Sequence, residues 1–154
     1  MIRCTPIGIC SWNYQLEGGG CSARTELNLM GESGRLFAGS SDHEVVKQGL
    51  MSGTWMLVRN GTGIASARKP NPFTRTFTIE RTGGLCMLEA RSALGRTMLF
   101  SGPGISCEIT PEHPFTRRAT ITGQWDDFTT VAFAFWLTSL LWRRAANNSS
   151  AGAA

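Results

Sequence analysis

The chain has 154 residues, 42% of them hydrophobic, and a formal net charge of +4. This length predicts one domain with a substantial core, and the hydrophobic fraction is ordinary for a globular protein. No run of Lys and Arg is longer than two residues, so the mild positive charge gives no support for a nucleic-acid partner.

Targeting signals and metal-site motifs are missing from the sequence. The first twelve residues contain one Arg and no sustained apolar segment, so we expect no secretory signal. The five Cys residues form no C-x-x-C pair and only two His are present, which argues against a zinc site or other cofactor. We therefore expect a cytoplasmic protein with free Cys, namely Cys4, Cys10, Cys21, Cys86 and Cys107.

Short alternating segments separated by turn residues fill the chain from residue 12 to residue 122. Residues 1–11 show no clear period, and residues 44–50 fit either a weak strand or one turn of helix. The other expected strands are 12–17, 23–30, 35–39, 54–59, 63–69, 75–81, 85–91, 96–101, 105–110 and 115–122. About ten to twelve short strands at regular spacing predict a β-sandwich or β-barrel.

Two local patterns are especially clear. Asn60-Gly61 is a strong signal for a two-residue hairpin, since both residues tolerate positive φ. In the next strand Phe77 and Ile79 alternate with polar residues, so we expect them on the same buried face.

Residues 128–142 form the longest uncharged, apolar stretch and predict a helix over about 126–144. Asp126 or Asp127 can cap its first turn, and Arg143 and Arg144 suit its C-terminal end. The few polar residues do not share one face, so the helix is apolar nearly all round. Such a helix is buried either in a protein core or in a membrane.

The length of this stretch favours a helix in the protein core over a membrane span, because a span needs about 20 apolar residues. We therefore predict a mainly β fold, a closed antiparallel barrel of about twelve strands around a C-terminal hydrophobic helix. Residues 1–144 form this single domain, and residues 145–154 form a disordered tail. The alternative is a tail-anchored protein with residues 128–142 in the membrane, because Trp136 and Trp142 with the two Arg resemble an interfacial belt.

This arrangement resembles the tubby-like superfamily, which includes the tubby C-terminal domain, the phospholipid scramblases and the LURP-one-related proteins. The resemblance rests on the segments WMLVRNGTGIASARK (55–69), TFTIERTGGLCMLEA (76–90) and 115–122, and on the Asp-led apolar end. It covers about residues 22–144 and implies a closed twelve-stranded barrel around a central helix.

The resemblance implies a non-enzymatic binding or scaffold module. Tubby domains bind phosphoinositides through a Lys-x-Arg pair, whereas this chain has adjacent Arg68 and Lys69, whose side chains should point to opposite faces. The calcium-binding acidic segment of scramblases has no counterpart. The candidate partner is an anionic phospholipid or membrane surface, met by Arg68, Lys69 and Arg75 with Arg81 nearby. The weak charge signal of these strands favours a solvated outer face for the same residues, and we expect a monomer.

No nucleophile–base pair or phosphate-binding loop supports an enzyme. His43 and His113 both stand among turn residues, so we expect exposed loop histidines. Adjacent Arg117 and Arg118 split across both faces of the expected strand, and an inward-pointing Arg would need an acidic partner such as Glu89 or Glu108.

Overall fold

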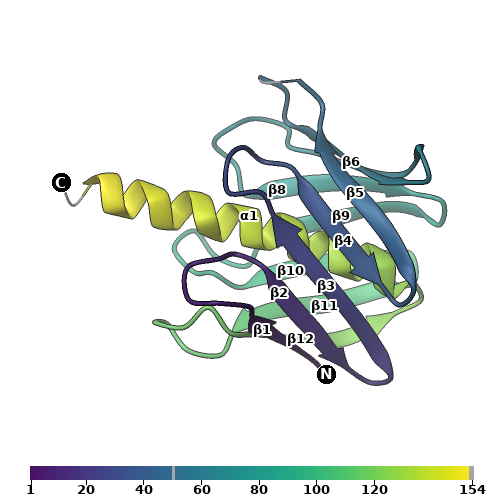
Figure 1. Ribbon diagram of the computed structural model, residues 1–154, viewed down its shortest axis with the longest axis horizontal. Coiled ribbons are helices and arrows are strands. Elements are labelled where there is room, and N and C mark those ends of the chain that lie inside the picture. Colours follow the sequence, from purple (N-terminus) through teal and green to yellow (C-terminus); the bar gives the residue numbers. More distant parts are fainter. Residues whose placement is uncertain (50, 153–154) are drawn as a thin grey trace.

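The computed structural model describes residues 1–49 and 51–152, which form twelve strands and one helix (Figure 1). The strands are β1 (Ile2–Pro6), β2 (Tyr14–Gly18), β3 (Cys21–Leu27), β4 (Gly34–Ala38), β5 (Ser41–Lys47), β6 (Thr54–Arg59), β7 (Thr62–Arg68), β8 (Thr76–Arg81), β9 (Gly84–Ala90), β10 (Met98–Gly102), β11 (Ile105–Pro111) and β12 (Ala119–Trp125). The helix α1 spans Phe128–Gly152.

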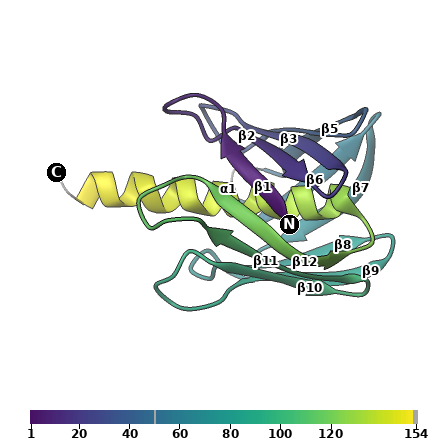
Figure 2. The same ribbon diagram turned by 90° about the horizontal axis from the view of Figure 1, so that it is seen from below.

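The strands form one closed antiparallel barrel. Each strand pairs with its neighbours in sequence, and β1 pairs with β12 to close the ring, with Ile2 opposite Ile121. The helix passes through the barrel and leaves at one end (Figure 2). The predicted fold class, a twelve-stranded barrel around a C-terminal helix, is confirmed.

The two ends of the barrel differ in how their strands are connected. One end, the hairpin rim, has short turns, and at the β6–β7 turn Asn60 and Gly61 have φ of 52° and 77°, as the sequence predicted. The other end, where α1 leaves, has six longer loops over residues 7–13, 28–33, 48–53, 69–75, 91–97 and 112–118, of which residue 50 is outside the described part. We call these loops, together with helix residues 143–149, the exit rim.

The middle of α1 is buried on every side. All residues from Thr130 to Trp142 are buried, and the buried inward residues of the strands surround them. The hydroxyls of Thr138 and Ser139 are satisfied within the helix, at 2.9 Å from Ala134 O and 2.8 Å from Trp136 O. The segment that the tail-anchor alternative placed in a bilayer therefore lies inside the barrel.

Among the residues that the structure describes, no helix combines the length and the apolar content that a membrane crossing requires.

Buried indole side chains attach the helix to the barrel wall and to one exit-rim loop. Trp136 Nε1 donates to Glu26 O at 2.9 Å, at the end of β3, and Trp142 Nε1 donates to Arg96 O at 3.1 Å. Gly34 makes the first of these contacts possible, because a Cβ there would lie 1.9 Å from Glu26 O and 2.9 Å from Trp136 Nε1. These bonds satisfy the indole N–H groups and fix the helix along the barrel axis.

Several boundaries differ from the sequence-based expectations. Residues 1–11 show no period in the sequence, yet they contain β1, in which Ile2 and Cys4 point into the core. The last strand is β12, later than the predicted 115–122, since residues 112–118 form a loop. The helix continues to Gly152 instead of ending near Arg144, so residues 145–152 of the predicted disordered tail are helical, and residues 153–154 are outside the described part.

Replacing Ala134 by Glu tests the burial of the helix. Ala134 is fully buried, so an unpaired carboxylate there should lower the free energy of unfolding by about 3–5 kcal/mol or prevent folding. Asn148→Glu, at an exposed position of the same helix, should change it by less than about 0.5 kcal/mol. Chemical denaturation followed by Trp fluorescence measures both, and equal stability of the two variants would contradict the central position of the helix.

Candidate functional site

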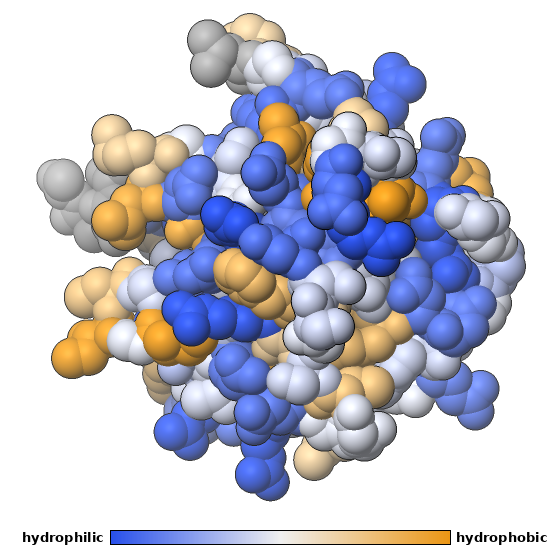
Figure 3. All heavy atoms as spheres, turned by 45° about the vertical axis from the view of Figure 1, so that its right-hand side comes forward, coloured by the Kyte–Doolittle hydropathy of each residue, from blue (hydrophilic) through white to orange (hydrophobic). Residues whose placement is uncertain are grey.

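Large hydrophobic side chains are exposed on every loop of the exit rim. In the described part of the chain, the seven most exposed ones are between 88% and 98% accessible, and all lie on this rim: Ile9, Leu29, Met30, Met51, Phe73, Leu94 and Phe115. The four other exposed large hydrophobic residues are only 39–66% accessible and lie on strands or at the N-terminus. Hydrophobic side chains protrude at the left margin of Figure 3, the side where the helix leaves. Exposed apolar residues gathered at one place commonly mark an interaction surface.

Charge is distributed unevenly between the exit rim and the remaining chain. The exit rim carries eight cationic side chains and two acidic ones, a formal charge of +6. The remaining sequence carries seven cationic and nine acidic side chains, a formal charge of −2. The rim cations are Lys69, Arg75, Arg91, Arg96, Arg117, Arg118, Arg143 and Arg144, and the rim acids are Glu32 and Glu112. The hydrophobic tips therefore project from a positively charged surface.

Arginine side chains connect the exit-rim loops to one another. Arg75, Arg96 and Arg117 each donate to backbone carbonyls of the next loop around the rim, and Arg143 of the helix donates to carbonyls of the β3–β4 loop. The distances are 2.6 Å from Arg75 to Gly95 O, 3.2 Å from Arg96 to Thr116 O and 3.0 Å from Arg117 to Gly8 O. A carbonyl accepts a hydrogen bond without cancelling the cation's charge, so the loops are held in place and the rim stays positive.

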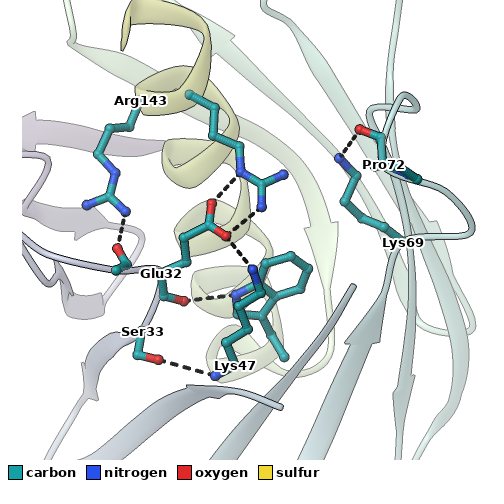
Figure 4. Close-up of polar contacts among 9 residues, drawn as sticks. Glu32, Ser33, Lys47, Lys69, Pro72 and Arg143 are labelled. Atoms are coloured by element: carbon teal, nitrogen blue, oxygen red, sulfur yellow. Dashed lines mark hydrogen bonds and ion pairs between the residues drawn. The ribbon is translucent and has the colours of Figure 1, made fainter. Parts of the chain in front are cut away.

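Glu32 is the main acidic group of this rim and links three elements (Figure 4). Its carboxylate accepts from Lys47 Nζ on β5 at 2.7 Å and from Arg144 Nη2 on α1 at 2.7 Å. Its backbone oxygen accepts from Trp55 Nε1 at 2.9 Å. The bond with Arg144, followed by the bond with Lys47, lowers the pKa of Glu32 to about 2.

Beside this cluster is a basic cavity of about 380 Å³, which we call the Trp55 cavity. Lys47, Trp55, Lys69 and Arg144 line it, and the side chains of Lys47 and Arg144 lie over the Trp55 ring, 5.4 Å and 5.6 Å from its centroid. Ser52 also lines the cavity, and its buried hydroxyl oxygen has no hydrogen-bond partner.

Lys69 is the cation of this cavity whose charge has the least compensation. Within the described part of the chain, its Nζ donates to a carbonyl alone, Pro72 O, at 3.3 Å (Figure 4). Burial lowers the pKa of Lys69, and repulsion from Arg144 lowers it further. Among the described residues, Glu32 is the one carboxylate that pairs with Lys47 and Arg144, and no ion pair involves Lys69, so an anion entering the cavity would offset the excess positive charge.

A second hollow of about 490 Å³ lies between the helix and the neighbouring loops. Leu94, Phe115 and Trp142 line it, together with Leu141 and Ala145. It therefore continues the apolar surface of two loop tips down to the side of the helix.

The three predicted binding residues separate in the structure. Arg68 ends β7, is exposed and lines an outer-wall cavity with Glu80, whereas Lys69 is buried and lines the Trp55 cavity. The two side chains thus point to opposite faces of the sheet, as expected for adjacent residues of a strand. Arg75 lines the 490 Å³ hollow and donates to carbonyls of residues 92–95. Lys69 and Arg75 thus belong to the exit rim, and Arg68 does not share a cavity with either.

Two side-chain expectations were wrong. His43 is not an exposed loop residue: it points inward from β5, is 1% exposed and lies 3.2 Å from Leu36 O through Nδ1. Arg117 is satisfied by the carbonyls of Gly8, Ile9 and Ser11, not by a carboxylate. Glu108 instead pairs with Arg91 at 2.9 Å.

The hydrophobic loop tips were not identified from the sequence. A signal was available, because in an antiparallel meander every second connection lies at the same end. Applied to the observed strands, this rule places Ile9, Leu29, Met51, Phe73, Leu94 and Phe115 at the same end. The expected strands concealed it, because they included Leu29 and Phe115 and lacked β1.

The structure gives no indication of a metal centre or a disulfide in its described residues. No group of three or more His, Cys, Asp or Glu side chains is placed to hold a metal ion there, and all five Cys are free. Burial raises the pKa of Cys4 and that of Cys107, the latter to about 11, which disfavours their thiolate forms.

No protein-family model, curated protein or solved structure matches this chain. The barrel agrees with the architecture that the tubby-like resemblance implied, but a barrel around a helix does not by itself identify that superfamily.

The low pKa of Glu32 predicts a pH-dependent contribution to stability. A carboxyl with a lowered folded-state pKa stabilises the fold above its ordinary pKa of 4.5, and this contribution disappears as the pH falls towards about 2. Glu32→Gln should therefore lower the free energy of unfolding by roughly 2 kcal/mol near neutral pH, with the difference shrinking below pH 4.5. Urea denaturation across this range measures it.

Glu89→Gln is the matched control, since Glu89 is exposed on β9. A Glu32→Gln deficit that stays constant at all pH values would contradict the assigned ion pairs.

Proposed function

We propose that this protein is a non-enzymatic module that binds the surface of membranes containing anionic phospholipids through its exit rim. The supporting observation is the coincidence at one barrel end of the seven most exposed large hydrophobic side chains and a formal charge of +6. Hydrophobic tips suit the boundary between headgroups and acyl chains, and basic side chains suit the phosphate layer above it.

The exposed hydrophobic side chains and the basic side chains of the exit rim should contribute comparable free energies to membrane binding. Burying a Phe or Leu side chain contributes about 1.5–3 kcal/mol, and a basic residue near an anionic membrane surface contributes about 1 kcal/mol. Several loops acting together therefore reach a useful affinity although each tip is small. The arginine–carbonyl bonds between loops reduce the entropy lost on docking, since the loops are already ordered.

We place one phosphate-bearing headgroup in the Trp55 cavity. Lys69 and Arg144 supply N–H donors there, and the Ser52 hydroxyl is an unused donor. The helix residues that follow Arg144, 145–152, are all uncharged, so they bring no charge into the headgroup layer that the rim contacts.

Replacing the two exposed Phe residues tests the hydrophobic contribution. The double variant Phe73→Ser, Phe115→Ser should bind vesicles that contain phosphatidylserine roughly thirtyfold more weakly. Each exposed ring would lose about 1 kcal/mol if half of it is buried in the membrane. Leu85→Ser removes an exposed hydrophobic side chain from the outer wall and should leave binding unchanged. Vesicle co-sedimentation measures all three proteins, and equal losses in both variants would reject the exit rim as the contact surface.

The neighbouring cations Lys69 and Arg68 provide a paired test of the headgroup site. Lys69→Gln should weaken binding to vesicles with phosphatidylinositol phosphate about tenfold, because a charge-assisted hydrogen bond is lost. Arg68→Gln removes the same charge from the outer wall and should cost no more than about threefold, because of screening. Titration of labelled protein with vesicles gives both affinities.

Failure of the wild-type protein to bind any anionic vesicle would reject the membrane function itself. Binding of the wild type with equal effects of Lys69→Gln and Arg68→Gln would reject only the headgroup site.

A further inference from the structure

The hairpin rim contains a polar cavity that the proposed membrane contact does not use. It has a volume of about 250 Å³ and lies where α1 begins, at the opposite end of the barrel from the exit rim. Residues from four successive strands and the first helical turn line it, including His43 of β5, Arg59 of β6, Arg81 of β8 and Asp127 before α1.

Two buried nitrogen atoms that line this cavity have no hydrogen-bond partner. One is Nε2 of His43, a residue only 1% exposed. The other is Nε of Arg81, whose side chain is 7% exposed. Buried polar atoms without partners are uncommon and costly, so two in one cavity indicate a polar occupant.

The existing contacts determine which hydrogen-bonding roles are open. His43 Nδ1 lies 3.2 Å from Leu36 O, which can only accept, so Nδ1 carries the proton and Nε2 of the neutral ring accepts. The Arg81 guanidinium is held by Asp126 at 3.1 Å and by Pro103 O, lies 4.0 Å from Asp127, and keeps an Nε–H without a hydrogen-bond partner. The cavity thus presents a donor and an acceptor together.

The charge balance favours an anion. Arg59 is exposed at the cavity and makes no ion pair with any described residue, whereas Arg81 is paired. The one acidic lining residue, Asp127, accepts from Thr129 N at 3.0 Å and from the Thr130 hydroxyl, and it lies 4.0 Å from Arg81, so the charge of Arg59 is the one without a counterion among the lining residues. The N-terminus of α1 adds a partial positive charge next to the cavity.

We propose that this cavity binds a small oxyanion that also carries a hydroxyl group, such as a protonated phosphate. Its negatively charged oxygens accept from Arg59 and from Arg81 Nε–H, and its hydroxyl donates to His43 Nε2. The volume suits a small ion or a terminal phosphate group better than a larger ligand, since sites for drug-sized molecules occupy about 300–1,000 Å³.

The test is a titration of the full chain with inorganic phosphate, followed by NMR of the imidazole nitrogens. The chain has only two histidines, and His113 lies on the exit rim, so the two signals report opposite ends of the barrel. The His43 signal should shift saturably. In Arg59→Gln, an exposed and foldable change, the same shift should need about tenfold more phosphate.

Arg3→Gln is the matched control, because Arg3 is exposed on β1 away from the cavity. It should behave as the wild type. An unmoved His43 signal in the wild type, or equal weakening by Arg59→Gln and Arg3→Gln, would overturn the proposal. This result is independent of vesicle binding, which depends on the exit rim.

Discussion

The structure depends on the burial of a helix that is apolar on every side. Thirteen consecutive residues, Thr130 to Trp142, are removed from water, and no single sheet face or partner helix could cover them all. A closed ring of strands can, because each strand presents one apolar face inward. The ring in turn needs the helix, since a barrel of this many strands would otherwise enclose an empty interior.

The direction of the helix makes the two barrel ends unequal. The helix begins at the hairpin rim, where its capping residue Asp127 and the inward Arg81 meet. It leaves between long loops at the other end, where Trp136 donates to a carbonyl of β3 and Trp142 donates to a loop carbonyl. The apolar interior is thus closed by charged side chains at the hairpin rim and by indole–carbonyl hydrogen bonds at the end where the helix leaves.

The exit rim combines features that folding alone does not require. Exposed Phe73, Leu94 and Phe115 contribute nothing to the core, and exposed apolar tips favour aggregation. Arg75 and Arg117 hold loops through carbonyls and so keep their charge uncompensated. A surface that is at once hydrophobic, cationic and well ordered is suited to binding an anionic, partly apolar partner, which is the basis of the proposed function.

The sequence by itself determined the hairpins, the inward faces of Phe77 and Ile79, and the central helix, because period and turn chemistry are local. A meander order implies that alternate loops share one end, but the exit rim stayed hidden while β1 was unpredicted and Leu29 and Phe115 were placed in strands. The sequence could not show that Lys69 joins Lys47 and Arg144 around Trp55. The inward orientation of His43 was not predicted either, because its neighbours Asp42 and Glu44 suggested a polar turn. Those relations depend on strand register and barrel closure, which bring residues far apart in sequence into contact.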